Sequence, residues 1–196
     1  MNIIIPMAGR GSRLRPHTLR TPKPLVPVAC KPIVEWLVRD IINLCPDKVD
    51  TIGFVIGDFG KEVEENLIKV AESFGAKGQI FHQEEALGTA HAIYCANELL
   101  TRPTIVAFAD TLFKTDFKID KKDDGVIFVQ KVEDPSAFGV VKLSPDGIIT
   151  DFVEKPTTFV SDLAIIGIYY FRDGVKLRSE IKYLLDTEIF ILFLGL

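Results

Sequence analysis

The sequence predicts an α/β fold in which an open sheet carries helices on its faces. Over the first half of the chain, short apolar runs typical of buried strands alternate with amphipathic segments typical of helices. This alternation indicates parallel strands joined by helical crossovers. The second half consists mainly of strand candidates, and one pair of them has the sequence of a hairpin.

The first strand is expected at residues 3–5, a β-branched run that fits a strand buried on both faces. The other strands of this half are expected at 51–56, 79–82 and 104–109, and the helices at 32–44, 61–74 and 86–100. The helix over 61–74 has the clearest apolar face, and Gly75 suits its C-terminal cap. Trp36, on the first helix, is expected in the core.

The second half predicts a hairpin and a closing helix. Strands are expected at 125–131, 138–143, 148–153 and 163–171, and a last helix at 173–185. The turn sequence Ser144-Pro145-Asp146-Gly147 separates the second and third of these strands, so these two are expected to pair as a hairpin. Because no repeat or flexible linker interrupts the chain, we expect a single domain.

Composition excludes several classes of protein. Hydrophobic residues make up 47% and charged residues 26% of the 196 residues, which excludes a disordered chain. A net charge of −4 without a long basic run argues against a nucleic-acid-binding surface. Cys30, Cys45 and Cys95 have no metal-binding spacing and are expected as free thiols in a reducing, cytoplasmic compartment. We see no signal peptide and no run long enough to span a membrane.

The segment from Gly9 to Val28 is the strongest local indication of chemistry. Its glycines let backbone N–H groups approach an anion, and Arg13 and Lys23 add positive charge. We therefore expect this segment to bind a phosphate-rich ligand. By itself, a GxG pair is more often an ordinary solvated turn. The segment is neither a Walker A loop nor a dinucleotide-binding fingerprint, because the required GK and third glycine are absent.

The same segment is similar to the signature of the sugar nucleotidyltransferases, also called nucleotide-sugar pyrophosphorylases. Their pattern, GxGxRLxPxTxxxPKPLxPV, is matched here by Gly9, Gly11, Arg13, Leu14, Pro16, Thr18, Pro22, Lys23, Pro24, Leu25, Pro27 and Val28. The chain most resembles glucose-1-phosphate thymidylyltransferase- and uridylyltransferase-like enzymes. The resemblance implies a three-layer α/β/α Rossmann-like nucleotidyltransferase fold with a mixed, mainly parallel sheet.

The resemblance implies two nucleotide-binding segments. The residues implied in nucleotide binding are Ala8, Gly9, Gly11 and Ser12 in the first segment and Gln83, Gly88 and Thr89 in the second. Gln83 offers one acceptor and two donors, enough to recognise the edge of a pyrimidine. From the residues alone, a polar helix start with Gln83 in solvent is the favoured interpretation. His17, His82 and His91 fit no metal or nucleophile pattern.

Three residues are implied in catalysis. Arg13 would bind the leaving pyrophosphate, Lys23 would lie at the α-phosphate, and Asp110 would bind Mg²⁺, the implied cofactor. Asp110 follows a buried strand, and ligands of open α/β sheets bind at the carboxyl ends of strands. From the residues alone, a turn or helix-capping aspartate is about as plausible.

The resemblance places the sugar phosphate on the second half of the chain. The implied residues are Gly139, Glu154, Lys155, Asp162, Gly167 and Tyr169. Glu154 can accept hydrogen bonds from sugar hydroxyls, and Lys155 can pair with the phosphate. Asp162 stands where the family usually has Asn. Without the resemblance, the Glu-Lys-Pro sequence would usually be an exposed strand end.

The implied activity is transfer of a nucleotidyl group from an NTP, with dTTP or UTP favoured, to a sugar-1-phosphate, with glucose-1-phosphate favoured. The alternatives are a mannose-1-phosphate guanylyltransferase, a choline-phosphate cytidylyltransferase, or a truncated non-catalytic binding module. Residues 1–186 are expected to form the catalytic domain without the family's C-terminal part, and 187–196 a divergent apolar tail. In the family, that C-terminal part often carries a subunit contact, so the resemblance leaves the question of a homo-oligomer undecided.

Overall fold

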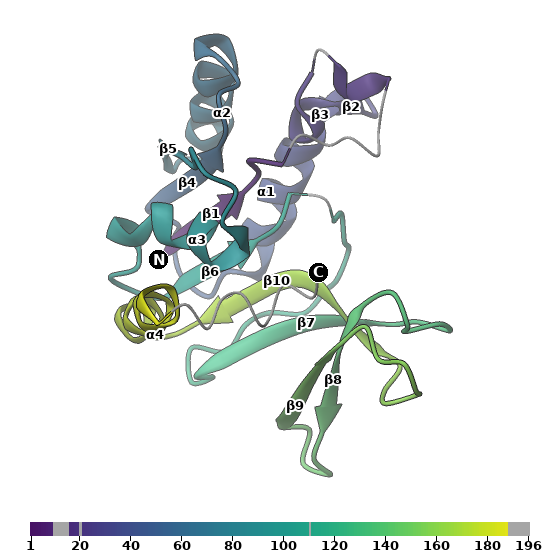
Figure 1. The fold of residues 1–196 in the computed structure, drawn as a ribbon. Coiled ribbons are helices and arrows are strands. Elements are labelled where there is room, and N and C mark those ends of the chain that lie inside the picture. The colour runs from purple at the N-terminus through teal and green to yellow at the C-terminus, as the bar shows by residue number, and fades with distance from the viewer. Residues whose placement is uncertain (10–15, 20, 110, 188–196) are drawn as a thin grey trace. The chain divides into compact units, whose positions relative to one another are not determined.

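The computed structural model describes residues 1–9, 16–19, 21–109 and 111–187 (Figure 1). The chain forms two compact units. The first unit comprises Met1–Val126 and the residues from Tyr170 onward, and the second comprises Ile127–Tyr169. Each unit is described by itself below.

A parallel sheet forms the centre of the first unit. Its strands are β1 (Asn2–Pro6), β4 (Thr51–Ile56), β5 (Lys77–His82) and β6 (Thr104–Ala107), in the order β5-β4-β1-β6. The pairs β1–β4, β1–β6 and β4–β5 are all parallel, which confirms the predicted arrangement. Strand β6 ends at Ala107, two residues earlier than the apolar run over 104–109 predicts.

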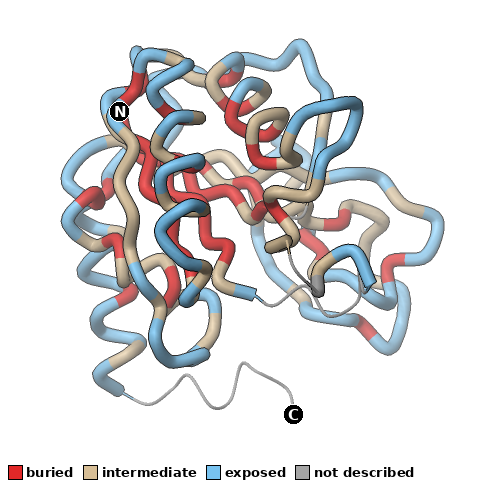
Figure 2. Tube along the Cα trace, turned by 90° about the horizontal axis from the view of Figure 1, so that it is seen from above, coloured by how far each residue is buried: buried red, intermediate tan, exposed pale blue. Residues whose placement is uncertain are grey.

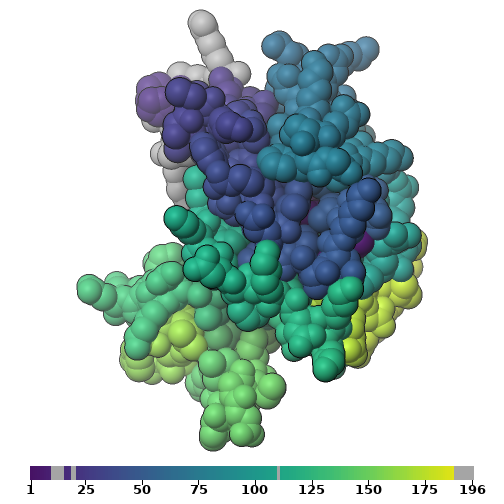
Figure 3. All heavy atoms as spheres, turned by 180° about the vertical axis from the view of Figure 1, so that it is seen from behind, coloured from purple at the N-terminus to yellow at the C-terminus, as the bar shows by residue number. Residues whose placement is uncertain are grey.

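Helices cover both faces of this sheet. The chain passes from β1 through α1 (Ile33–Leu44) to β4 and through α2 (Lys61–Ser73) to β5, then returns through α3 (Gly88–Cys95) to β6. Right-handed crossovers therefore put α1 and α2 on one face, which Figure 3 shows, and α3 on the other. Side-chain positions agree: a Cβ on Gly78 would lie 2.7 Å from Cα of Ile68 in α2, whereas one on Gly53 would meet Leu99, just beyond α3.

The core lies between the layers (Figure 2). Every residue of β1 is buried, as the unbroken apolar run predicts. The buried face of α1 consists of Val34, Leu37, Val38, Ile41 and Leu44. Asn2 is a polar residue in this core, and its side-chain nitrogen donates to the Leu99 carbonyl at 2.7 Å, so its burial does not leave that donor unsatisfied.

The ends of two helices show how local chemistry sets helix length. Beyond α2, Gly75 has φ +76° and its N–H donates to the Glu72 carbonyl at 2.9 Å, which confirms that this glycine ends the helix. The helix expected over 86–100 is wrong in extent. It begins only at Gly88, whose φ of 90° is not helical, and stops at Cys95 before a short 3-10 turn, η4 (Asn97–Leu99). The Asn97 side chain donates to the Tyr94 carbonyl, a local bond of the kind that competes with helix.

The proline-rich segment before α1 is more regular than its sequence predicts. It contains the 3-10 turns η2 (His17–Leu19) and η3 (Lys23–Leu25) and a small hairpin of β2 (Pro27–Val28) and β3 (Lys31–Pro32). The two turn residues, Ala29 and Cys30, have φ of 48° and 66°, the left-handed values that a two-residue hairpin loop needs.

Trp36 connects this hairpin to α1. The expectation that it lies in the core is wrong. It is half-exposed, and its Nε1 donates to the Val28 carbonyl at 2.8 Å. The Arg39 guanidinium lies 4.3 Å from the centre of its ring. The polar end of the indole therefore has a partner outside the core, which only the folded hairpin provides.

The strands of the second unit pair differently. They are β7 (Gly125–Lys131), β8 (Gly139–Leu143), β9 (Ile149–Glu154) and β10 (Leu163–Phe171), and the unit boundaries fall within β7 and β10. β8 pairs antiparallel with β9 and with β10, and β7 pairs with β10. The predicted hairpin at Ser144–Gly147 is confirmed, and the Gly147 N–H donates to the Ser144 carbonyl at 2.9 Å.

After β10 the chain returns to the first unit as α4 (Gly174–Asp186). The Asp173 side chain caps this helix by accepting from the Lys176 N–H at 2.9 Å. In the part of the chain that the structure describes, no helix is both long enough and apolar enough to cross a membrane. Parallel strands under helices and antiparallel strands in the second unit together confirm the predicted α/β class with a mixed, mainly parallel sheet.

Candidate functional site

The carboxyl edge of the parallel sheet gathers the segments predicted to bind nucleotide. Ala8 and Gly9 follow β1, Gln83 follows β5, and Ala109 lies two residues beyond β6. Backbone bonds link these exits: Met7 N–H donates to the Val55 carbonyl and Gln83 N–H to the Ile56 carbonyl, both at 2.8 Å. Because the strands are parallel, their ends meet at one edge, which is where open α/β sheets bind ligands.

The start of the predicted phosphate loop is open. Gly9 is exposed, and a Cβ placed on it would have no described heavy atom within 4 Å. The described residues around Gly9 therefore leave room for a side chain, and they do not require glycine here for packing. Gly11, Ser12, Arg13 and Asp110 lie outside the described residues.

Lys23 lies on η3 and is half-buried. Its backbone carbonyl accepts from the Val26 N–H at 3.2 Å, and the Val26 carbonyl in turn accepts from the Ile33 N–H at 3.1 Å at the start of α1. Together with the Trp36 bond to Val28 described above, these hydrogen bonds connect the backbone of Lys23 to the first turns of α1.

Gln83 is held by the start of α3. Its Nε2 donates to the Gly88 carbonyl at 3.1 Å and lies 3.2 Å from Nδ1 of His91. Thr89 is exposed in the first turn of the same helix. The structure thus brings Gln83 and Gly88 together, and it adds His91, which the sequence analysis left without a role. In the sequence, Gly88 and His91 are three residues apart, which is about one helical turn. This spacing is the sequence feature that could have pointed to His91.

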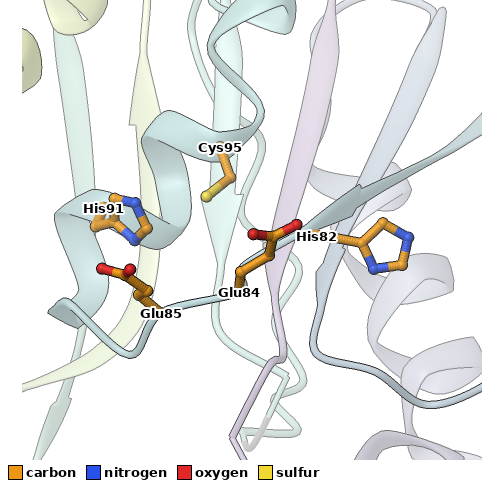
Figure 4. A pocket seen from close by; sticks show the side chains of 5 residues that line it. All are labelled: His82, Glu84, Glu85, His91 and Cys95. Atoms are coloured by element: carbon orange, nitrogen blue, oxygen red, sulfur yellow. The ribbon is translucent and has the colours of Figure 1, made fainter.

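A cavity of about 230 Å³ adjoins this cluster, lined by His82, Glu84, Glu85, His91 and Cys95 (Figure 4). His91 and Cys95 come from α3 and the two glutamates from the loop before it. His82 points away from the other four, and its Nε2 lies 3.5 Å from Glu64 of α2. The volume is below the roughly 300–1,000 Å³ of sites for whole drug-sized ligands, so the cavity suits part of a ligand. Two carboxylates in its described lining disfavour phosphate there.

In the second unit, three of the six predicted sugar-phosphate residues, Gly139, Glu154 and Lys155, form a cluster. Gly139 and Glu154 are register partners in the β8–β9 pair. The Lys155 ammonium lies 3.7 Å from Oε1 of Glu154, and its backbone N–H donates to the Phe138 carbonyl at 3.0 Å. Burial, and to a lesser degree the charge of Glu154, raises the pKa of Tyr169, which belongs to the same unit.

Lys155 adopts a backbone conformation that is uncommon for a residue with a side chain. Its φ is 42°, in the left-handed region. Such geometry in a non-glycine residue is found where surrounding contacts hold it, often at functional sites.

Asp162 and Gly167 have other surroundings. The Asp162 carboxylate pairs with Lys131 of β7 at 3.0 Å, and its backbone carbonyl accepts from the Val132 N–H at 2.9 Å. These described contacts tie Asp162 to the end of β7 rather than to Glu154. Gly167 lies within β10 with φ 77°, two residues before Tyr169.

The described residues contain no cluster of three side chains that could hold a metal ion. Among residues 1–9, 16–19, 21–109 and 111–187, no three His, Cys, Asp or Glu side chains are grouped so as to hold an ion. Mg²⁺ in phosphate-transfer sites needs only one or two carboxylates, because substrate phosphates and waters complete its shell. The lack of a three-residue cluster in this part of the chain is therefore compatible with that ion.

The fold defines an α/β protein of the nucleotidyltransferase type. Residues 2–191 match the family model described as nucleotidyl transferase, and the chain belongs to this family. The family resemblance inferred from residues 9–28 is thereby confirmed.

Two curated relatives and one solved structure illustrate the family. The catalytic subunit beta of mannose-1-phosphate guanylyltransferase of Drosophila pseudoobscura pseudoobscura is 34% identical over 198 residues, 95% of this chain and 52% of that protein. The low-salt glycan biosynthesis nucleotidyltransferase of Haloferax volcanii is 34% identical over 182 residues, 89% of this chain and 50% of that protein. A putative glucose-1-phosphate thymidylyltransferase from Bacillus anthracis, solved in complex with a sucrose, superposes with TM-score 0.75 and 28% identity, over 93% of this chain and 74% of that one.

The chain spans about half the length of the curated relatives it matches, at 52% and 50% of those two proteins. Two of these three proteins have a base and a sugar in their names, and the two names differ in both. They agree on the chemistry of nucleotidyl transfer and differ on base and sugar.

Proposed function

We propose that this chain carries the catalytic domain of a cytoplasmic sugar-1-phosphate nucleotidyltransferase, which joins an NTP and a sugar-1-phosphate into a nucleotide-sugar and releases pyrophosphate. The observation that carries the proposal is the cluster of Gly139, Glu154 and Lys155 in a member of this family. A carboxylate that can accept from sugar hydroxyls and an ammonium that can bind a phosphate lie side by side there. The arrangement is suited to a phosphorylated polyol.

In the proposed reaction, an oxygen of the sugar phosphate attacks the α-phosphorus of the NTP. A new P–O bond forms as the bond from the α-phosphorus to the pyrophosphate oxygen breaks, and pyrophosphate leaves with the bonding electron pair. No protein nucleophile is needed, so catalysis rests on positioning and on neutralising charge on the phosphates. Lys155 would hold the sugar phosphate, Lys23 the α-phosphate and Arg13 the leaving pyrophosphate.

The nucleotide would use the carboxyl edge of the parallel sheet. Ala8, Gly9, Gly11 and Ser12 would direct backbone N–H groups to the phosphates, and Gln83, Gly88 and Thr89 would contact the base. Supporting this placement, the acidic cavity beside Gln83 suits a base better than a phosphate.

Mg²⁺ is the proposed cofactor, held by the carboxylate of Asp110. When bound, it would neutralise negative charge on the phosphates. A single aspartate is an ordinary protein donor for Mg²⁺ when substrate phosphates supply further oxygens.

Two substrate pairs are favoured by specific observations. The solved relative at 28% identity is titled a putative glucose-1-phosphate thymidylyltransferase, which supports dTTP with glucose-1-phosphate. UTP stays beside dTTP in this pair because Gln83 has the groups to recognise either pyrimidine. The relative at 34% identity is a mannose-1-phosphate guanylyltransferase, which supports GTP with mannose-1-phosphate. We propose the first pair as the leading candidate and the second as its rival.

The test is pyrophosphate release by the purified chain with each NTP and a panel of sugar-1-phosphates, with Mg²⁺ present. Release that requires a sugar-1-phosphate supports the proposal, and the preferred pair identifies the substrates. Release with choline phosphate instead, or nucleotide binding without turnover for any pair, would overturn it. Lys155→Gln should abolish release, whereas Lys142→Gln, a lysine of the same hairpin paired with Asp151 at 3.8 Å, should not.

A further inference from the structure

The backbone of Lys155 adopts a conformation that two local effects disfavour. Its φ of 42° is uncommon for a residue with a side chain, and the following Pro156 favours extended angles in the residue before it. Pro156 is buried, whereas Lys155 is exposed. Contacts outside Lys155 must therefore stabilise its backbone, and one of them is the hydrogen bond from its N–H to the Phe138 carbonyl at 3.0 Å.

Phe138 is the last residue of a tight turn. Its N–H donates to the carbonyl of the buried Pro135 at 3.0 Å, which closes a turn of four residues. Because this N–H is used within the turn, the carbonyl is the backbone group that Phe138 offers to Lys155. Their bond continues the β8–β9 ladder one residue beyond the register partners Gly139 and Glu154. The orientation of the turn therefore helps to set where the backbone of Lys155 lies.

Asp134 stabilises this turn from the position before it. Its Oδ1 accepts from the Ser136 N–H at 3.0 Å, which makes an Asx turn that overlaps the four-residue turn. This bond is the main reason that the pKa of Asp134 lies below the ordinary 3.8, so the carboxylate is the form that accepts at neutral pH. Since Asp134 is exposed, its side chain acts through this hydrogen bond rather than through packing.

We infer that Asp134 is a positioning residue for the sugar-1-phosphate: it stabilises the turn that presents the Phe138 carbonyl to Lys155, and thereby fixes where the Lys155 ammonium lies. The inference rests on the proposed function, in which Lys155 holds the sugar phosphate. Asp134 acts through hydrogen bonds in series and not by contact with the substrate. The turn needs an accepting oxygen at this position, so asparagine, whose Oδ1 also accepts, should replace aspartate and alanine should not.

The first test is hydrogen exchange of the Lys155 backbone N–H, followed by NMR on the purified chain. In Asp134→Ala this amide should exchange about fivefold faster, the equilibrium equivalent of one net hydrogen bond. In Asp134→Asn its rate should stay within about twofold of that in the unchanged protein. The Gly147 N–H is the internal control, because it donates to Ser144 at the other end of the hairpin. A Lys155 rate that Asp134→Ala does not change would overturn the inference.

The second test is the kinetics of pyrophosphate release with the preferred substrate pair and Mg²⁺. Asp134→Ala should raise the KM for the sugar-1-phosphate about fivefold and leave the KM for the NTP within about twofold, and Asp134→Asn should restore the first value.

Asp120→Ala is the matched control for both tests. Asp120 makes the same kind of turn in the first unit, where its Oδ1 accepts from the Lys122 N–H at 2.9 Å, so its removal should change neither KM. An equal rise of both KM values in Asp134→Ala, or an asparagine variant that behaves like the alanine variant, would overturn the inference. Absence of release with every substrate pair would instead overturn the proposed function, and hydrogen exchange of Lys155 would still decide the role of Asp134.

Discussion

The carboxylate of Glu154 occupies the space that a side chain on Gly139 would need. Its Oε2 lies 2.8 Å from the position of a Cβ on Gly139, closer than real Cβ contacts allow. The two residues oppose each other in the β8–β9 pair, 15 positions apart in the sequence. Glycine at 139 is therefore tied to where the Glu154 carboxylate lies.

Gly139→Ala should displace Glu154 without unfolding the protein. The atom in the way is the far end of an exposed, flexible side chain, which can move at little cost, so the free energy of unfolding should change by less than about 1 kcal/mol. The KM for the sugar-1-phosphate should rise roughly tenfold, because its binding carboxylate is misplaced. Steady-state kinetics and urea unfolding measure the two effects. An unchanged KM would show that Glu154 does not contribute to binding of the sugar-1-phosphate.

Lys23→Ala should lower kcat far more than it weakens nucleotide binding. If Lys23 neutralises charge that develops at the α-phosphate, its loss should cost about 100-fold in kcat with a nucleotide Kd within about threefold. Lys31→Ala is the control, since Lys31 lies on the neighbouring hairpin and pairs with Glu35. Equal losses in kcat and affinity would mean that Lys23 only binds the nucleotide.

Gly78→Ala should be destabilising, in contrast to Gly139→Ala. Here the new Cβ would lie 2.7 Å from Cα of Ile68 and 3.1 Å from its carbonyl oxygen, so it would push on the backbone of α2. Separating α2 from β5 should cost about 1–3 kcal/mol of unfolding free energy. Urea denaturation followed by circular dichroism measures it. A variant as stable as the unchanged protein would show that α2 shifts freely on the sheet.

Asp50 should make stability depend on acid pH. Its carboxylate accepts from the Met1 ammonium at 2.9 Å and from Arg102 at 2.8 Å, and the ammonium bond is the main reason that its pKa lies below the ordinary 3.8. A carboxyl with a lowered folded pKa stabilises the fold above its unfolded pKa, and this contribution disappears as pH falls through the folded value.

Asp50→Asn should therefore lower the free energy of unfolding at about pH 7, and the difference from the unchanged protein should shrink below about pH 4. Urea unfolding over this range measures the difference. Asp151→Asn is the control, because its cross-strand pair with Lys142 spans 3.8 Å between exposed side chains and should contribute little. A difference that stays constant with pH would contradict the assignment.

Local patterns in the sequence predicted most of the fold. The buried run of β1, the amphipathic face and glycine cap of α2, and the Ser144–Gly147 turn depend on neighbours a few residues away, so their periodicity is visible without a structure. The extent of α3 and the place of Trp36 were wrong. The start of α3 depends on the backbone angles of Gly88, which the periodicity does not show, and the place of Trp36 depends on a carbonyl of the hairpin.

The sequence alone determined the order of elements, the family, and the candidate residues for phosphate, base and sugar. Only the tertiary structure decided which of these residues share a site: Glu154 lies over Gly139 and beside Lys155, whereas Asp162 pairs with Lys131. It also decided that His91 and Gly88 engage the Gln83 amide. The reason is physical. Spacing along the chain sets which face of a strand or helix a side chain occupies, but strand register and loop backbone angles set which distant groups come within hydrogen-bonding distance.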